Sequence, residues 1–248
     1  MKPTAILFRG EETDQLRRKL AGGRGFLLFG LAGVGKSLLL NAVLPEFKET
    51  IYSESSGTIQ AVFKQTALAL LRRADPVLIR SCGRSGSEAL KRKSAVSLKG
   101  VVIEALRQRR YRLVLDHLQL PSHVFAAAAR EITGWADTPI IGVARSAHME
   151  DVGQLHPLWP DKSERFELRN LSFDVARAFA NEIAARNGLN AENLSEFLER
   201  VVQSSGGNPG AILAMVAMAA QPKYRADQHI KIAPLYIDFR LSWGPAVR

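Results

Sequence analysis

Short apolar runs alternate along the chain with longer stretches in which apolar residues recur every three or four positions. The short runs have the length of strands, and the longer stretches are typical of helices that bury one face. This alternation predicts an α/β fold in which helices cover both faces of a parallel sheet. The five predicted strands span residues 25–30, 49–54, 111–116, 139–144 and 164–169. The predicted helices between them span residues 36–46, 58–73, 96–109 and 122–134.

Helical patterns alone follow residue 170. Ser172 has the side chain of a good N-cap, and Gly188 stands where that helix would end. Apolar residues at one-sided helical spacing over 194–202 predict a second helix. Asn208 and Pro209 would begin a third, because proline fits the first turn of a helix. That third helix is apolar nearly all round, which predicts burial.

We therefore expect a three-layer αβα core over residues 1–170 and a small helical lid over 171–220. The tail, 221–248, mixes turns with extended-looking pieces such as LYIDF and stays unassigned. Residues 80–95, RSCGRSGSEALKRKSA, are polar and rich in glycine and serine, which predicts a long mobile loop.

Composition restricts the class of protein. The 248 residues are 46% hydrophobic and 23% charged, as in ordinary globular proteins that bury a core. The N-terminus is a poor signal peptide, and no apolar run approaches the ~20 residues of a membrane helix. Cys82 is the single cysteine, so no internal disulfide can form. These features predict a cytoplasmic protein with no membrane association.

The net charge of +10 is concentrated in one segment. Residues 72–112, the basic segment, hold twelve Lys and Arg against three Asp and Glu, a local excess of nine positive charges. Such a segment can neutralise nucleic-acid phosphates, or it can be an ordinary solvated surface.

The stretch GLAGVGKS, residues 30–37, carries the strongest chemical signal. Gly30, Gly35, Lys36 and Ser37 match the phosphate-loop pattern G-x-x-x-x-G-K-[ST] at every position. The stretch follows a predicted strand and precedes a predicted helix, the context that the motif needs. The alternative is a glycine-rich turn with an exposed lysine.

A phosphate loop works because the start of a helix has backbone N–H groups without intrahelical acceptors and a partial positive charge. Lys36 would bridge the β- and γ-phosphates of ATP, and the hydroxyl of Ser37 would hold Mg²⁺. The residues expected to line the nucleotide are Gly30, Leu31, Ala32, Gly33, Val34, Gly35, Lys36, Ser37 and Leu38. Asp116 ends the predicted strand 111–116 and is the expected acidic partner of Mg²⁺; the alternative is a structural aspartate.

With these motifs the sequence resembles the AAA+ ATPases and their relatives, the signal-transducing STAND NTPases, from about residue 8 to residue 220. FRGEETDQL, beginning at Phe8, resembles the N-terminal motif that lies over the adenine in that group. VARS resembles the sensor-arginine segment of STAND proteins and implies that Arg145 senses the γ-phosphate. GGNPGAI, which contains Pro209, resembles the lid segment that closes on the nucleotide.

Three positions depart from that resemblance. His117 follows Asp116 where hydrolysing members usually have an acidic residue, so we expect slow hydrolysis with His117 as a weak base or as a bystander. Glu11 stands where the N-terminal motif usually has arginine, and Gly210 stands where many lids carry one. An arginine finger from a neighbouring subunit is plausible in this group, and the candidates are Arg130, Arg165 and Arg169.

Two functions fit these expectations. One is a slowly hydrolysing ATP/ADP switch that binds duplex DNA non-specifically through the basic segment, as in small regulators of transposition or replication. The other is a STAND-like signalling or defence NTPase whose nucleotide state gates a protein partner. Either can form a homo-oligomer. A small-molecule kinase ranks lower, because nothing resembles its substrate lid. Metal-centred catalysis is not expected either, because the five histidines lack ligand-like spacing.

Overall fold

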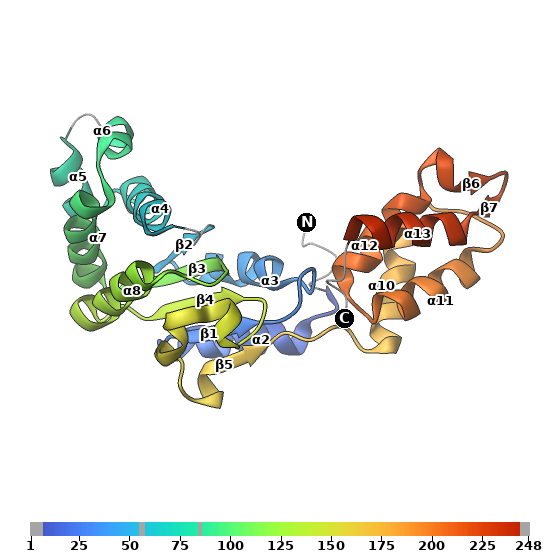
Figure 1. The fold of residues 1–248 in the computed structure, drawn as a ribbon, viewed down its shortest axis with the longest axis horizontal. Helices are drawn as coiled ribbons and strands as arrows, with labels where there is room; N and C mark the ends of the chain where they lie inside the picture. Colours follow the sequence, from blue (N-terminus) through green and yellow to red (C-terminus); the bar gives the residue numbers. More distant parts are fainter. Residues whose placement is uncertain (1–6, 55–57, 84–85, 244–248) are drawn as a thin grey trace. The chain divides into compact units, whose positions relative to one another are not determined.

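The computed structural model describes residues 7–54, 58–83 and 86–243 (Figure 1). Five parallel strands form one sheet in the order β2-β3-β4-β1-β5. Their bounds are β1 Phe26–Phe29, β2 Thr50–Ser53, β3 Arg112–Leu118, β4 Ile140–Ala144 and β5 Arg165–Glu167. The predicted α/β class with a five-stranded parallel sheet is thereby confirmed.

The chain divides into two compact units. The sheet unit contains residues 15–29 and 43–167, and therefore all five strands. The helical unit contains the described residues up to Asp14, residues 30–42 and the chain from Leu168 onward. The phosphate loop, residues 30–37, thus groups with the helical unit, although it directly follows β1 in the chain.

In the sheet unit, three helices provide crossovers between strands: α4 (Ile59–Arg72), α7 (Ala95–Arg109) and α8 (His123–Ala136). Each begins at a serine or threonine N-cap whose side chain accepts a backbone N–H of the first turn. Their buried faces form one apolar cluster with strand residues such as Leu113 and Leu115. The bounds lie close to those that the sequence pattern predicts.

The prediction of a mobile loop over residues 80–95 is wrong for the described residues. Residues 84–85 lie outside the described part. Two short helices, α5 (Pro76–Cys82) and α6 (Gly86–Arg92), occupy most of it, and α7 begins at its end (Figure 1). Asp75 caps α5 by accepting the N–H groups of Val77 and Leu78 at 3.0 and 3.3 Å. The high glycine and serine content suggested a loop. The Asp-Pro pair that starts α5, and the apolar residues that the two helices bury, are the signals of helix in this segment.

Strand β3 also continues past the predicted end at Asp116. His117 adopts a left-handed conformation, φ 56°, and the register with β4 shifts between Leu115 and Leu118. Strand β3 therefore continues beyond an irregularity that lies next to Asp116.

Trp159 is the largest fully buried side chain of the sheet unit and packs over the middle of β4. A Cβ atom added to Gly142 would lie 2.4 Å from its ring. The indole N–H donates to the carbonyl oxygen of Ile140 at 3.0 Å. Glycine in β4 therefore makes the space that the indole fills.

Trp159→Ala is expected to lower the free energy of unfolding by roughly 3–5 kcal/mol, because it leaves a cavity and removes the indole hydrogen bond to Ile140 O. Urea denaturation followed by circular dichroism measures the change. Trp135→Ala is the matched control, since Trp135 is 71% exposed, and should change stability by less than about 0.5 kcal/mol. Equal effects of the two substitutions would contradict this packing.

The helical unit contains α10 (Phe173–Arg186), α11 (Leu194–Ser205) and α12 (Pro209–Ala219), as predicted. A further helix, α13 (Ile232–Trp243), follows a two-residue-per-strand hairpin, β6 (Arg225–Ala226) and β7 (His229–Ile230). The helices share one apolar cluster, the bundle core. The extended interpretation of LYIDF is wrong: Leu235 and Phe239 are buried one helical turn apart. Exposed Ile237 between them obscured that spacing.

Three further α-helices lie in the described part of the chain. Helix α2 (Gly10–Ala21) begins at its glycine, so the acidic residues Glu11 and Glu12 lie in its first turn, where the partial positive charge of the helix favours them. Helix α3 (Lys36–Val43) follows the phosphate loop, and α9 (Met149–Val152) is a single turn. Among the described residues, no helix combines the length and the apolar character needed to cross a membrane.

Candidate nucleotide-binding site

Helix α3 begins at Lys36, so the last two residues of the phosphate loop form its start, as the motif requires. The ammonium group of Lys36 donates to the carbonyl oxygens of Gly30 and Leu31 at 2.6 and 3.0 Å, so the side chain folds back across its own loop. The first hydrogen bond of α3 runs from Leu39 N to Gly35 O at 2.9 Å. The backbone N–H groups of the loop and of the first turn of α3 lie at a helix start, the position from which backbone N–H groups bind phosphate.

Glycine is required at the start of the loop. Gly30 has φ 153°, and a Cβ atom there would lie 2.2 Å from the carbonyl oxygen of Leu168. Gly35 has φ 102° and open space on the side where a Cβ would lie. The loop thus has positive-φ glycines at Gly30 and Gly35, the backbone conformations with which glycine-rich loops surround a phosphate chain.

Arg9 holds the loop from the N-terminal segment, and the sequence analysis did not identify it. Its buried guanidinium donates to Val34 O at 3.3 Å and to Arg169 O at 2.7 Å, and pairs with Glu12 at 2.6 Å. An arginine three residues before an acidic residue was the available signal. The resemblance to AAA+ ATPases placed an arginine at position 11, where this chain has Glu11.

Phe8 and Pro209 both lie in the helical unit. The ring of Phe8 packs edge-on against Phe179 of α10, with 5.6 Å between centroids, and borders the bundle core. Pro209 is buried as the first residue of α12. Their predicted contacts with the nucleotide stay predictions.

In the sheet unit, Asp116 is 1% exposed and is held at both carboxylate oxygens. The hydroxyl of Tyr52, on the neighbouring strand β2, donates to Oδ2. The backbone N–H of His117 donates to Oδ1 at 2.7 Å. Tyr52 was missed by the sequence analysis, because the pairing of β2 with β3 cannot be read from local pattern. A buried carboxylate fixed in this way suits a role in an Mg²⁺ site.

The predicted base and the predicted sensor are exposed. The side chain of His117 is 68% exposed, with Nε2 3.9 Å from Asp116 Oδ2. Arg145 directly follows β4, next to β3 in the sheet, and is exposed. Parallel strands end at one edge, so Arg145 and Asp116 share the carboxyl edge of the sheet.

The three finger candidates differ in their surroundings. Arg165 is partly buried and donates to Trp159 O at 3.0 Å, and it contacts His156 Nε2 at 3.0 Å. Its guanidinium therefore serves the fold of its own chain. Arg130 and Arg169 are exposed.

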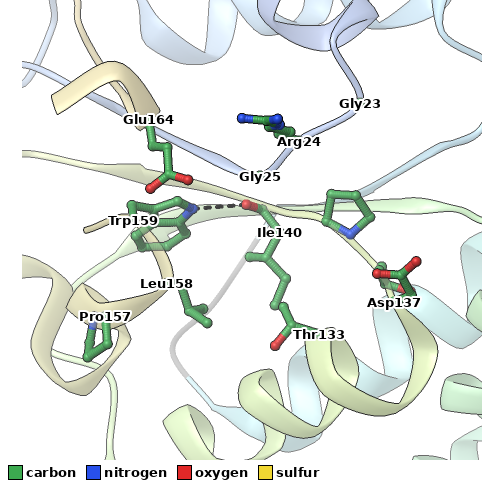
Figure 2. A pocket seen from close by; sticks show the side chains of 12 residues that line it. Gly23, Arg24, Gly25, Thr133, Asp137, Ile140, Pro157, Leu158, Trp159 and Glu164 are labelled. Carbon is green, nitrogen blue, oxygen red and sulfur yellow. Dashed lines mark hydrogen bonds between the residues drawn. The ribbon is translucent and has the colours of Figure 1, made fainter. Parts of the chain in front are cut away.

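A separate cavity of about 410 Å³ lies at the amino ends of β1 and β4, the opposite edge of the sheet (Figure 2). Arg24, Asp137 and Glu164 bring charged groups to it, and Trp159 forms part of its wall. None of the predicted site residues lines it. The cavity therefore lies away from the carboxyl edge of the sheet, which is the edge where ligands of open α/β sheets bind.

Comparison with known proteins identifies solved structures with a fold similar to that of this chain. No protein-family model matches the sequence, and no curated protein matches it. A Walker-type ATPase of Pyrococcus abyssi is similar over 87% of this chain and 68% of its own, with TM-score 0.56 and 17% identity. The Orc1 protein of Aeropyrum pernix, solved in complex with DNA, is similar over 95% and 65%, with TM-score 0.63 and 14% identity. Cdc6p of Pyrobaculum aerophilum is similar over 90% and 64%, with TM-score 0.59 and 16% identity.

The chain therefore has the fold of the AAA+ P-loop ATPases. It spans about two thirds of the length of these solved chains, between 64% and 68%. The sequence resemblance to AAA+ ATPases is confirmed at the level of the fold.

Proposed function

We propose that the protein binds ATP and ADP with Mg²⁺ and acts as a slowly hydrolysing nucleotide switch. The observation that carries the proposal is the phosphate loop: a complete motif, a left-handed glycine cradle and a lysine at the start of α3. The AAA+ fold of the solved neighbours supports it. Isothermal titration of ATP with and without Mg²⁺ tests it, and absence of binding under both conditions would overturn it.

Each residue has a proposed role. Lys36 binds the β- and γ-phosphates, Ser37 and Asp116 are Mg²⁺ ligands, and Arg145 responds to the γ-phosphate. Magnesium supplies charge neutralisation on the transferred phosphate when bound. His117 is the weak base, and its exposure and lack of negative charge favour slow turnover.

We further propose that the switch associates with duplex DNA through the basic segment. Helices α4 and α7 pack on each other, and exposed arginines lie at their carboxyl ends: Arg72, Arg109 and Arg110. Arg73 belongs to the fold instead, because it donates to the carbonyl oxygens of Lys48 and Thr50. The Orc1 protein of similar fold was solved in complex with DNA.

The DNA proposal predicts steep salt dependence, since each neutralised phosphate contributes about −0.9 to the slope of log K against log salt. The double variant Arg72→Gln/Arg109→Gln should flatten that slope by roughly 1.8 in fluorescence-anisotropy titrations with duplex DNA. Arg177→Gln/Arg200→Gln, which removes the same charge from exposed positions on α10 and α11, is the matched control.

Equal slopes of log K against log salt for the two double variants would show that the basic segment does not bind the DNA. Light scattering on the ATP-loaded protein, with and without DNA, tests the alternative. A monomer indifferent to DNA would favour the STAND-like switch with a protein partner.

A further inference from the structure

Two main-chain carbonyl oxygens in the middle of the phosphate loop accept hydrogen bonds from the start of α12. The side-chain amide nitrogen of Asn208 donates to Ala32 O at 2.8 Å. The backbone N–H of Gly210 donates to Gly33 O at 2.9 Å. All four residues belong to the helical unit. The loop is therefore bound by one helix of the bundle through its backbone.

Asn208 is fully buried, and both ends of its amide are used. Its Oδ1 accepts the N–H of Ala211 at 3.2 Å and so caps α12. Its Nδ2 also lies 3.3 Å from Asn170 Oδ1, in the segment that follows β5. One side chain thus both caps the helix and holds the loop.

The approach of helix and loop depends on two glycines. A Cβ atom on Gly210 would lie 2.8 Å from Gly33 Cα and 2.9 Å from Gly33 O. Gly33 has φ 77°, and a Cβ there would lie 2.7 Å from Asn208 Oδ1. The backbones therefore touch directly, with no side chain between them.

Helix α12 also supplies the centre of the bundle core, with Ile212, Met215 and Val216 buried. A change in the shape of the loop moves the carbonyl oxygens that hold the start of this helix. The stability of the bundle and the shape of the loop are therefore linked.

We propose that Asn208 and Gly210 are positioning residues through which the bundle responds to the shape of the phosphate loop, and not to the γ-phosphate. This inference rests on the proposed nucleotide site. Loop amides cradle the α- and β-phosphates, which ADP and ATP share. No residue from Asn208 to Gly210 carries a charge that could bind the γ-phosphate. Through these contacts ADP and ATP therefore stabilise the bundle equally. By linkage, the bundle strengthens the binding of ADP and of ATP by the same factor.

The variant Asn208→Ser tests the coupling, because serine still caps α12 but is too short to reach Ala32. Its affinity for ADP and for ATP should fall by the same factor, about 5- to 10-fold for one hydrogen bond. Hydrogen exchange in α12 should show less protection by either nucleotide than in the unmodified chain. Calorimetry with ADP and with ATP measures both affinities.

Asn193→Ser is the matched control. Asn193 joins the start of α11 to Ile230: its Nδ2 donates to Ile230 O at 2.9 Å, and its Oδ1 accepts the N–H of Ile230, so these bonds lie within the helical unit. Its nucleotide affinities should stay unchanged. Gly210→Ala is the second loop variant: alanine favours the helix itself, so a loss of both affinities reports the contact with Gly33.

The outcomes separate the two proposals. If the unmodified chain binds neither nucleotide, the nucleotide site itself is wrong. If it binds both, a loss confined to ATP in Asn208→Ser and Gly210→Ala would overturn the inference, because it would show sensing of the γ-phosphate. Unchanged affinity for both nucleotides in folded variants would also overturn it.

Discussion

Lys36→Ala is expected to lower the affinity for ATP on the order of 10²-fold, because it removes charge-assisted hydrogen bonds to phosphate that contribute about 1.5–3 kcal/mol each. The side chain has a second effect. Its ammonium group bridges the carbonyl oxygens of Gly30 and Leu31, so the variant also loses bonds that shape the loop. Calorimetric titration with ATP and Mg²⁺ measures the loss.

Lys231→Ala is the control for the change in net charge, since Lys231 is exposed in the same unit. Its affinity for ATP should equal that of the unmodified chain. Circular dichroism should show a folded protein for both variants, because Lys36 is only partly buried. Normal binding by Lys36→Ala would place the nucleotide elsewhere in the molecule.

The strands of the sheet could be predicted from sequence because they are locally apolar and sharply bounded. All five appear within two residues of their predicted starts. The four helices predicted between the strands also appear, as α3, α4, α7 and α8. What local pattern could not supply is the sheet order, which brings Tyr52 on β2 beside Asp116 on β3.

The errors have a physical cause as well. Helices α5 and α6 are short, and tertiary contacts stabilise them more than intrinsic propensity does: Leu78 and Leu90 are buried among α4 and α7 residues. Composition alone therefore suggested a loop. In the short helix α13, exposed apolar residues lie beside buried ones. Its apolar positions therefore do not follow the spacing of a one-sided helix.

The motif identified the loop, but not what surrounds it. Arg9 lies 25 residues before Val34 in the chain, and Asn208 lies 176 residues after Ala32. Both act through bonds to backbone carbonyl oxygens, which any sequence provides at every position. Such contacts leave no residue-type signature in the loop, and only the folded backbone reveals them.

Asp116→Asn is the second variant with a large expected effect. Asparagine keeps the shape of the side chain, so the strand should fold, but it removes the negative charge proposed to bind Mg²⁺. Its amide nitrogen cannot accept a hydrogen bond from Tyr52 or from the N–H of His117. ATP hydrolysis should fall on the order of 10²-fold, as for other lost charge-stabilising groups, and the strengthening of ATP binding by Mg²⁺ should disappear.

Tyr52→Phe separates that role from a structural one. It removes one hydrogen bond to Asp116 and keeps the carboxylate charge, so hydrolysis should fall by less than about 10-fold. Phosphate release measured across a range of Mg²⁺ concentrations distinguishes the two variants. If Asp116→Asn keeps the Mg²⁺ dependence of the unmodified chain, the buried carboxylate only joins β2 to β3, and the metal is held by other groups. If both variants lose hydrolysis equally, Tyr52 acts through more than the orientation of Asp116.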